Sequence, residues 1–164
     1  MPDFFSRLST LLRKTTSRAV SARRKSDEKF SIFQSEMDGR PLIATVDMAL
    51  HGYKSKAALP WFLGLSTPLI EPTNDGLPTP GDSIALNDWE ALVEKRIDPA
   101  CQFVYVGHVT WNGSREVLYY IDRVEPVASL LKKLRDDHVT RPFAFRCERD
   151  DPWDNVSIYF RQTS

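Results

Sequence analysis

The sequence predicts an α+β fold, and three observations lead to it. Segments rich in aromatic and β-branched residues, typical of strands, alternate with two segments whose apolar residues recur at helical spacing. From residue 61 onward these segments follow the order β-α-β-β-α-β, and two further strand-like segments precede them. The 164 residues, of which 41% are hydrophobic and 27% charged, suit one globular domain.

The first predicted strands cover residues 29–36 and 42–50. The Asp-Gly pair between them, at residues 38 and 39, favours a tight turn because glycine accepts a positive φ. Residues 51–60 are expected to form a loop. Residues 61–67 are nearly all apolar, which is typical of a strand in the middle of a sheet.

A long loop is predicted over residues 68–82, which contain four prolines and an Asn-Asp-Gly run. Ser83 is the expected N-cap of a helix that ends near Arg96. The residues of this helix that we expect to be buried are Ile84, Trp89, Leu92 and Val93.

The clearest hairpin signal is Asn112-Gly113, which joins predicted strands at residues 102–111 and 115–122. A second helix is predicted over residues 125–138. Two strands are expected after it, at residues 143–148 and 155–162.

The order β-α-β-β-α-β is that of a ferredoxin-like core, which the amino-terminal hairpin and the last strand would extend. In that arrangement the strands that follow the two helices lie at opposite edges of the four-stranded core. Cys101 and Cys147 should therefore be too far apart to form a disulfide.

Residues 1–28 predict a basic amphipathic arm that precedes a domain at residues 29–164. No glycine or proline interrupts residues 3–25, so a helix is expected there. Its apolar side would carry Phe4, Phe5, Leu8, Leu11, Leu12 and Ala19. The opposite side and its flank would carry Arg7, Arg13, Lys14 and Arg18.

Charge also separates the arm from the body. Residues 1–25 hold seven basic residues and one acidic residue, a net charge of +6, whereas the remainder holds 15 basic and 21 acidic residues, a net charge of −6. Three roles follow for the arm: it docks on anionic membrane, it binds an acidic partner, or it packs on its own body. The acidic body argues against binding of nucleic acid.

The sequence contains neither a signal peptide nor an apolar run of the ~20 residues needed to cross a bilayer. We therefore expect a cytoplasmic protein. If residues 1–25 bind lipid, it would lie peripherally at the inner face of the membrane.

Several stretches resemble a known family. The quoted residues are Phe30 to Leu50 with its Asp-Gly turn, Asp75-Gly76-Leu77-Pro78, Val104 to Thr110 followed by Gly113, Arg115 and Tyr120, and finally Asp151-Pro152-Trp153. Together they resemble the bacterial domain of unknown function 695 family over about residues 29–160. The resemblance implies little chemistry, because the family has no assigned activity. Some members adjoin a domain like the protein inhibitors of ribonuclease E, which implies regulation through protein contact.

No metal or catalytic constellation stands out. The three histidines, His51, His108 and His138, lack the spacing of metal ligands, and the cysteines lack a Cys-x-x-Cys motif. We therefore expect no metal and no cofactor. His108 lies on a predicted strand, where a hydrogen-bonded structural histidine is favoured over a functional one.

The candidate interaction loop comprises Asp75, Gly76, Leu77 and Pro78, together with Arg115 beside the hairpin turn. Loops with motif-like residues often carry function. Turn chemistry alone also explains the motif, because Asp bonds nearby backbone, Gly supplies a positive φ and Pro stiffens the exit. Arg115 would contact an anion or carboxylate, or would pair across the sheet.

These observations favour a non-catalytic regulatory or binding module that acts through a protein partner. One alternative is an immunity protein that neutralises a toxin encoded by a neighbouring gene. Another is a hydrolase or transferase whose site the sequence hides.

Overall fold

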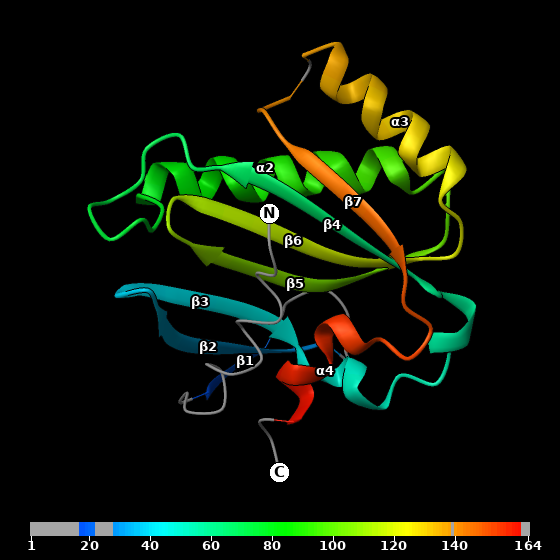
Figure 1. Ribbon diagram of the computed structural model, residues 1–164, viewed down its shortest axis with the longest axis horizontal. Helices are drawn as coiled ribbons and strands as arrows, with labels where there is room; N and C mark the ends of the chain where they lie inside the picture. Colours follow the sequence, from blue (N-terminus) through cyan, green and yellow to red (C-terminus); the bar gives the residue numbers. More distant parts are fainter. Residues whose placement is uncertain (1–16, 22–27, 139, 162–164) are drawn as a thin grey trace.

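The computed structural model describes residues 17–21, 28–138 and 140–161, and for residues 17–21 it describes the backbone alone. Within these ranges the chain forms an antiparallel sheet, three α-helices and two 3-10 helices (Figure 1). The strands are β1 (Ser17–Ser21), β2 (Lys29–Met37), β3 (Arg40–Asp47), β4 (Trp61–Pro68), β5 (Phe103–Trp111), β6 (Ser114–Ile121) and β7 (Ala144–Arg149). The helices are η2 (Met48–Gly52), η3 (Lys56–Ala58), α2 (Pro80–Ile97), α3 (Glu125–Asp136) and α4 (Asp154–Phe160).

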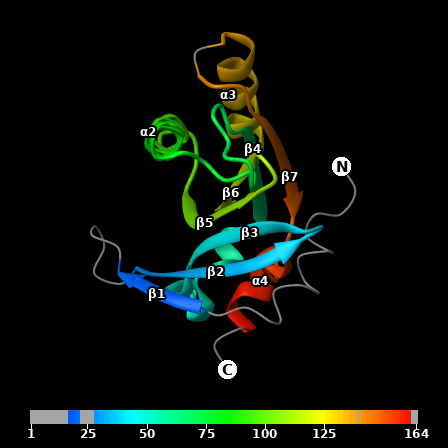
Figure 2. The same ribbon diagram turned by 90° about the vertical axis from the view of Figure 1, so that its left-hand side faces the viewer.

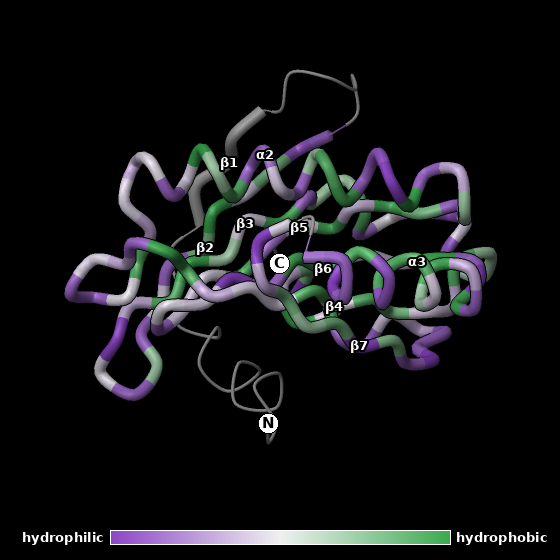
Figure 3. The backbone as a smooth tube through the Cα atoms, turned by 90° about the horizontal axis from the view of Figure 1, so that it is seen from above, coloured by the Kyte–Doolittle hydropathy of each residue, from purple (hydrophilic) through white to green (hydrophobic). Residues whose placement is uncertain are grey.

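The seven strands follow the order β1-β2-β3-β5-β6-β4-β7. Helices α2 and α3 cover one face of the half that contains β6, β4 and β7, and α4 lies on the other face, against β2 and β3 (Figures 1 and 2). Each face has its own hydrophobic core. Along α2, hydrophobic and hydrophilic residues alternate, so one side of this helix packs on the sheet (Figure 3).

The sheet bends where β3 meets β5. The pairing of β5 with β6 shifts register between Tyr105 and Gly107, and Gly107 has a φ of +153°. A Cβ atom at residue 107 would overlap the backbone carbonyl of Thr45 on β3. Only glycine therefore lets the two strands approach this closely.

Most predicted elements are confirmed within a few residues. The Asn-Gly hairpin joins β5 to β6, the apolar run forms β4 between β6 and β7, and β5 and β7 lie on opposite sides of β6 and β4. Both Cys101 and Cys147 are free thiols. Helix α2 starts earlier than expected, because the Thr79 hydroxyl, not that of Ser83, accepts the capping hydrogen bond from the backbone N–H of Asp82, at 3.3 Å.

The expected last strand is wrong, because residues 154–160 form helix α4. The Asp150 carboxylate accepts hydrogen bonds from the backbone N–H groups of Asp154 and Asn155, at 2.9 and 3.0 Å, and so caps the helix start. Val156, Ile158, Tyr159 and Phe160 are all buried in this helix.

The expected amino-terminal helix is wrong over part of its length. Ser17–Ser21 form β1, which pairs antiparallel with β2 from Ser17 opposite Phe33 to Ser21 opposite Lys29. The backbone of β2 offers hydrogen-bonding groups on this side, which a strand satisfies and a helix does not. The other residues of the expected helix lie outside the described part of the chain.

None of the helices in the described part of the chain is both long enough and apolar enough to span a membrane.

Candidate functional site

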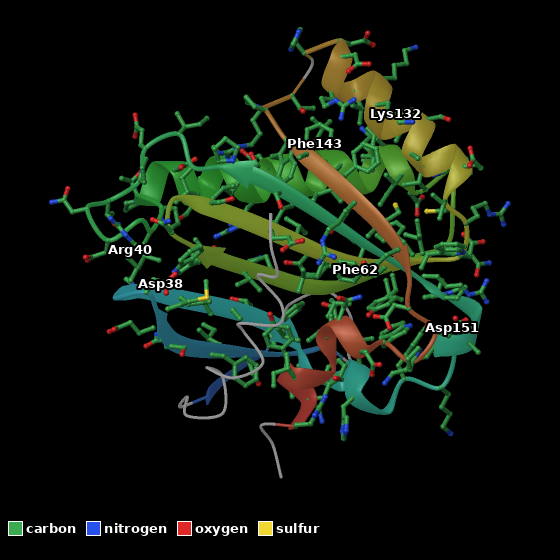
Figure 4. The ribbon with its side chains drawn as sticks, in the orientation of Figure 1. Asp38, Arg40, Phe62, Lys132, Phe143 and Asp151 are labelled. Atoms are coloured by element: carbon green, nitrogen blue, oxygen red, sulfur yellow. The ribbon has the colours of Figure 1, made fainter. Side chains whose placement is uncertain are left out.

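Three turns meet at one end of the molecule, which we call the loop end: the β2–β3 turn (residues 38–39), the loop before α2 (residues 69–79) and the β5–β6 turn (residues 112–113). The backbone N–H of Gly113 donates to the carbonyl of Gly76 at 2.9 Å, and the N–H of Leu69 donates to the carbonyl of Gly113 at 2.8 Å. Arg40 donates to the carbonyl of Asn74 at 3.4 Å. Segments far apart in sequence thus form one surface, near the labelled Asp38 and Arg40 in Figure 4.

Gly76 fixes the fit between the loop and the hairpin turn. Its φ is +77°, and a Cβ atom there would lie 2.9 Å from both Asn112 Cα and Gly113 N. The glycine of the predicted motif is therefore required twice, for its conformation and for close contact.

The loop is held in one shape by its own hydrogen bonds. The backbone N–H of Leu77 donates to the Thr73 hydroxyl at 3.2 Å, and the N–H of Thr73 donates to the carbonyl of Leu77 at 2.7 Å. The turn chemistry expected of Asp75 is thus supplied by Thr73, and the Asp75 side chain is exposed.

A buried ion pair anchors the same loop from beneath. Arg141 lies 3.2 Å from Asp82, and their side chains are only 6% and 1% exposed. The other Asp82 oxygen accepts from the backbone N–H groups of Ile70 and Glu71, at 2.8 and 3.2 Å. Arg141 also donates to the Thr67 hydroxyl at 3.0 Å. The loop, the start of α2 and the end of β4 are thereby tied together.

Arg115 does not join the exposed loop. It is buried beneath α2, where it donates to Glu90 at 3.1 Å and to the Thr110 hydroxyl at 3.1 Å. Arg115 therefore pairs within the chain, but with Glu90 on α2 and not with a residue across the sheet.

Glu90 is the centre of a polar cluster between α2 and β5. It accepts a hydrogen bond from the Tyr105 hydroxyl at 3.1 Å, and that hydroxyl lies 2.8 Å from His108 Nδ1. Burial tends to raise the pKa of Glu90, but the hydrogen bonds and charges of His108 and Arg115 outweigh it and lower the pKa. Burial and the neighbouring Glu90 raise the pKa of Tyr105. These groups satisfy one another, as expected of a structural brace.

The loop end also carries exposed apolar side chains that the sequence analysis did not identify. Among the described residues, the large hydrophobic side chains exposed to solvent are Ile70 and Ile84, each 65% exposed. Trp89 and Val93 are buried in α2 as expected, but Ile84, which was also expected to be buried, is exposed, and Leu86 is buried instead. Glu71 and Asp75, in the same loop as Ile70, are also exposed.

The Asp151-Pro152-Trp153 motif lies at the opposite end from Asp38 and Arg40 (Figure 4). Trp153 is fully buried, stacks on Tyr120 with ring centroids 4.0 Å apart, and donates from Nε1 to the carbonyl of Leu59 at 3.0 Å. This motif attaches α4 to the sheet, so its role is structural.

The arm residues Phe4, Phe5, Arg7, Leu8, Leu11, Leu12, Arg13 and Lys14 lie outside the described residues, and Arg18 falls in β1. Within the described ranges, no group of three His, Cys, Asp or Glu side chains is placed to hold a metal ion.

The fold and these contacts define a class: an α+β domain whose antiparallel sheet presents one braced set of turns. The family of unknown function known as DUF695 matches residues 28–161, and the chain belongs to this family. Neither a curated protein nor a solved structure matches the chain.

Proposed function

We propose that this protein is a non-catalytic binding module and that its loop end contacts a protein partner. The observation that carries the proposal is the pair Ile70 and Ile84, each 65% exposed, at the one end where three turns are braced together. Large exposed apolar side chains with a polar rim are typical of protein interfaces. A pre-ordered loop also loses little conformational entropy on binding.

The chemistry of the surface indicates the kind of partner. Glu71 and Asp75 are exposed in the same loop as Ile70, so the partner should present an apolar patch bordered by Lys or Arg. The βαββαβ part of the chain, with sheet order β5-β6-β4-β7, supports a ferredoxin-like core as the scaffold that holds the loop.

Affinity capture with three versions of the full chain tests the proposal. The test variant carries Ile70→Asp with Ile84→Asp, and the control carries Lys132→Asp on exposed α3, far from Arg40 (Figure 4). Proteins captured by wild type and control but lost by the test variant are then purified and titrated. We expect at least a tenfold loss of affinity in the test variant. Equal binding by all three versions would refute the loop end as the interface.

If the protein is instead an immunity protein, the same loop end would bind the toxin. Co-expression with a toxic neighbouring gene product should restore growth with the wild-type chain and the Lys132→Asp control, but not with the test variant. Growth rescue by all versions would place toxin binding elsewhere.

An enzymatic role would draw on the Glu90, Tyr105 and His108 cluster, because the His108 side chain retains 18% exposure. His108→Ala should abolish such an activity and leave partner binding unchanged.

We also propose that the basic arm, residues 1–25, contacts anionic membrane and keeps the protein at the inner face of that membrane.

A further inference from the structure

Strand β7 forms one edge of the sheet. It pairs with β4 from Ala144 opposite Ser66 to Arg149 opposite Trp61, and no described strand pairs with its other side. Figure 2 shows β7 as the outermost strand on this side. Such an edge offers a row of backbone groups to another chain.

The pairing with β4 shows which backbone groups are free. The N–H of Asp150 donates to the carbonyl of Pro60 at 2.8 Å, so the backbone of residue 150 faces β4. Hydrogen-bonding direction alternates along a strand, and the β4–β7 register has no shift. Residues 144, 146 and 148 therefore also face β4. The N–H and C=O groups of Phe145, Cys147 and Arg149 point outward.

We propose that two copies of this chain pair through β7, antiparallel, with the two-fold axis at Cys147. Each Cys147 then exchanges two backbone hydrogen bonds with the other copy's Cys147. Phe145 pairs in the same way with the other copy's Arg149. This register uses every outward N–H and C=O of the strand.

Charge selects this register over its neighbours. Arg146 falls opposite the other copy's Glu148, and this happens twice across the axis, because the sequence around Cys147 is Arg-Cys-Glu. Within one copy Arg146 already pairs with Glu148 at 2.6 Å and with Glu116 at 3.3 Å. The side chains of Arg146 and Glu148 are nevertheless 40% and 45% exposed, so each also has surface to offer to the other copy. Opposite charges on facing residues stabilise a strand pair.

The next registers in either direction place like charges opposite each other. An axis at residue 146 sets Arg146 against Arg146, and an axis at residue 148 sets Glu148 against Glu148. Facing like charges destabilise a pair of strands. A two-fold axis perpendicular to the sheet pairs residues whose side chains lie on the same face. An axis midway between two residues would pair side chains from opposite faces, so those registers are excluded.

Cysteine chemistry provides a direct test. Hydrogen-bonded facing residues have Cα atoms about 5.5 Å apart, within the range of roughly 4.4–6.8 Å that a disulfide spans. The full chain carrying Cys101→Ser retains Cys147 as its one thiol. Oxidised glutathione at pH 9, which leaves as two molecules of reduced glutathione, should convert it to a disulfide-linked dimer of unchanged fold. Recovery of monomer alone, at a protein concentration where light scattering detects dimer, would overturn the register.

Three substitutions test whether this edge, and no other surface, forms the dimer. Cys147→Pro removes an N–H group that the chain's own sheet does not use, whereas Cys147→Ala keeps it. We expect sedimentation to show dimer for wild type and Cys147→Ala, and monomer for Cys147→Pro, with cooperative thermal transitions in all three. Glu148→Arg should weaken the dimer at least tenfold by facing the other copy's Arg146. A wild-type monomer, or a dimer that both Cys147→Pro and Glu148→Arg leave intact, would refute pairing through β7. The loop-end proposal is unaffected by either outcome.

Discussion

Arg141 and Asp82 form an ion pair at 3.2 Å although 59 positions separate them, and neither side chain is more than 6% exposed. The pair joins the segment before β7 to the first turn of α2. Because Asp82 also accepts from the N–H groups of Ile70 and Glu71, the pair holds the loop that carries the proposed interface.

We expect Asp82→Asn to destabilise the protein by about 3 kcal/mol, because removing one partner of a buried pair leaves the other charge uncompensated. Urea unfolding measures the loss, and amide hydrogen exchange at Ile70 and Glu71 should accelerate. Exposed Asp88 lies on the same helix, and Asp88→Asn should change stability by less than about 0.5 kcal/mol. Equal effects of the two substitutions would show that the ion pair is not the anchor.

Glu90→Gln should reduce stability at pH 7 by about 2–4 kcal/mol, because buried Arg115 loses its carboxylate partner. The pKa of Glu90 is lowered in the folded state. Its ionic contribution is therefore complete above the ordinary pKa of the carboxyl group and disappears as the pH falls through the lowered value. The stability difference between wild type and variant should shrink below about pH 4.

Urea midpoints from pH 7 to pH 3 measure this difference, with exposed Glu36→Gln on β2 as the control. A difference that stays constant over the range would mean that the charge of Glu90 contributes nothing.

Gly76→Ala should cost about 1–3 kcal/mol, since residue 76 combines a φ of +77° with backbone atoms at 2.9 Å from any Cβ atom. Gly81, five residues later in α2, has no atom within 4 Å of a built Cβ. Gly81→Ala should therefore stabilise the chain by about 0.5–1 kcal/mol, the usual helix preference. Thermal unfolding compares the stability of the two variants with that of wild type. A stabilising effect of Gly76→Ala would show that the loop does not need this close contact.

The full chain should bind anionic vesicles, and Leu8→Asp with Leu12→Asp should abolish the binding. Each basic residue near an anionic surface adds about 1 kcal/mol, and each buried large side chain adds roughly 1.5–3 kcal/mol. Sedimentation with anionic and neutral vesicles, at low and high salt, measures the fraction of protein bound to the vesicles. If the leucine variant sediments like wild type, the arm acts on a protein or on its own body.

Local patterns were enough to predict the elements whose structure depends on neighbours in sequence. Asn112-Gly113 marks the β5–β6 hairpin because both residues adopt a positive φ, of 47° and 78°. The spacing of Val127, Leu131 and Leu134 marks α3, whose buried residues these are.

Contacts across the fold decided what the sequence analysis missed. The alternation of Val156, Ile158 and Phe160 predicts a strand, but the Asp150 carboxylate caps the chain there and burial of Tyr159 as well favours a helix. In the sequence Arg115 lies beside a turn, and only the position of Glu90 on α2 shows that Arg115 is buried.

The sequence by itself determined the α+β class, the order of β4 to β7 with the helices between them, and the glycine turns, because each depends on periodicity or on the conformational range of one or two residues. The tertiary structure alone decided that three distant turns form one surface, that Ile84 faces solvent, and that the free backbone groups of β7 flank Arg146 and Glu148. Those outcomes depend on strand order and register, which bring together residues that no local pattern relates.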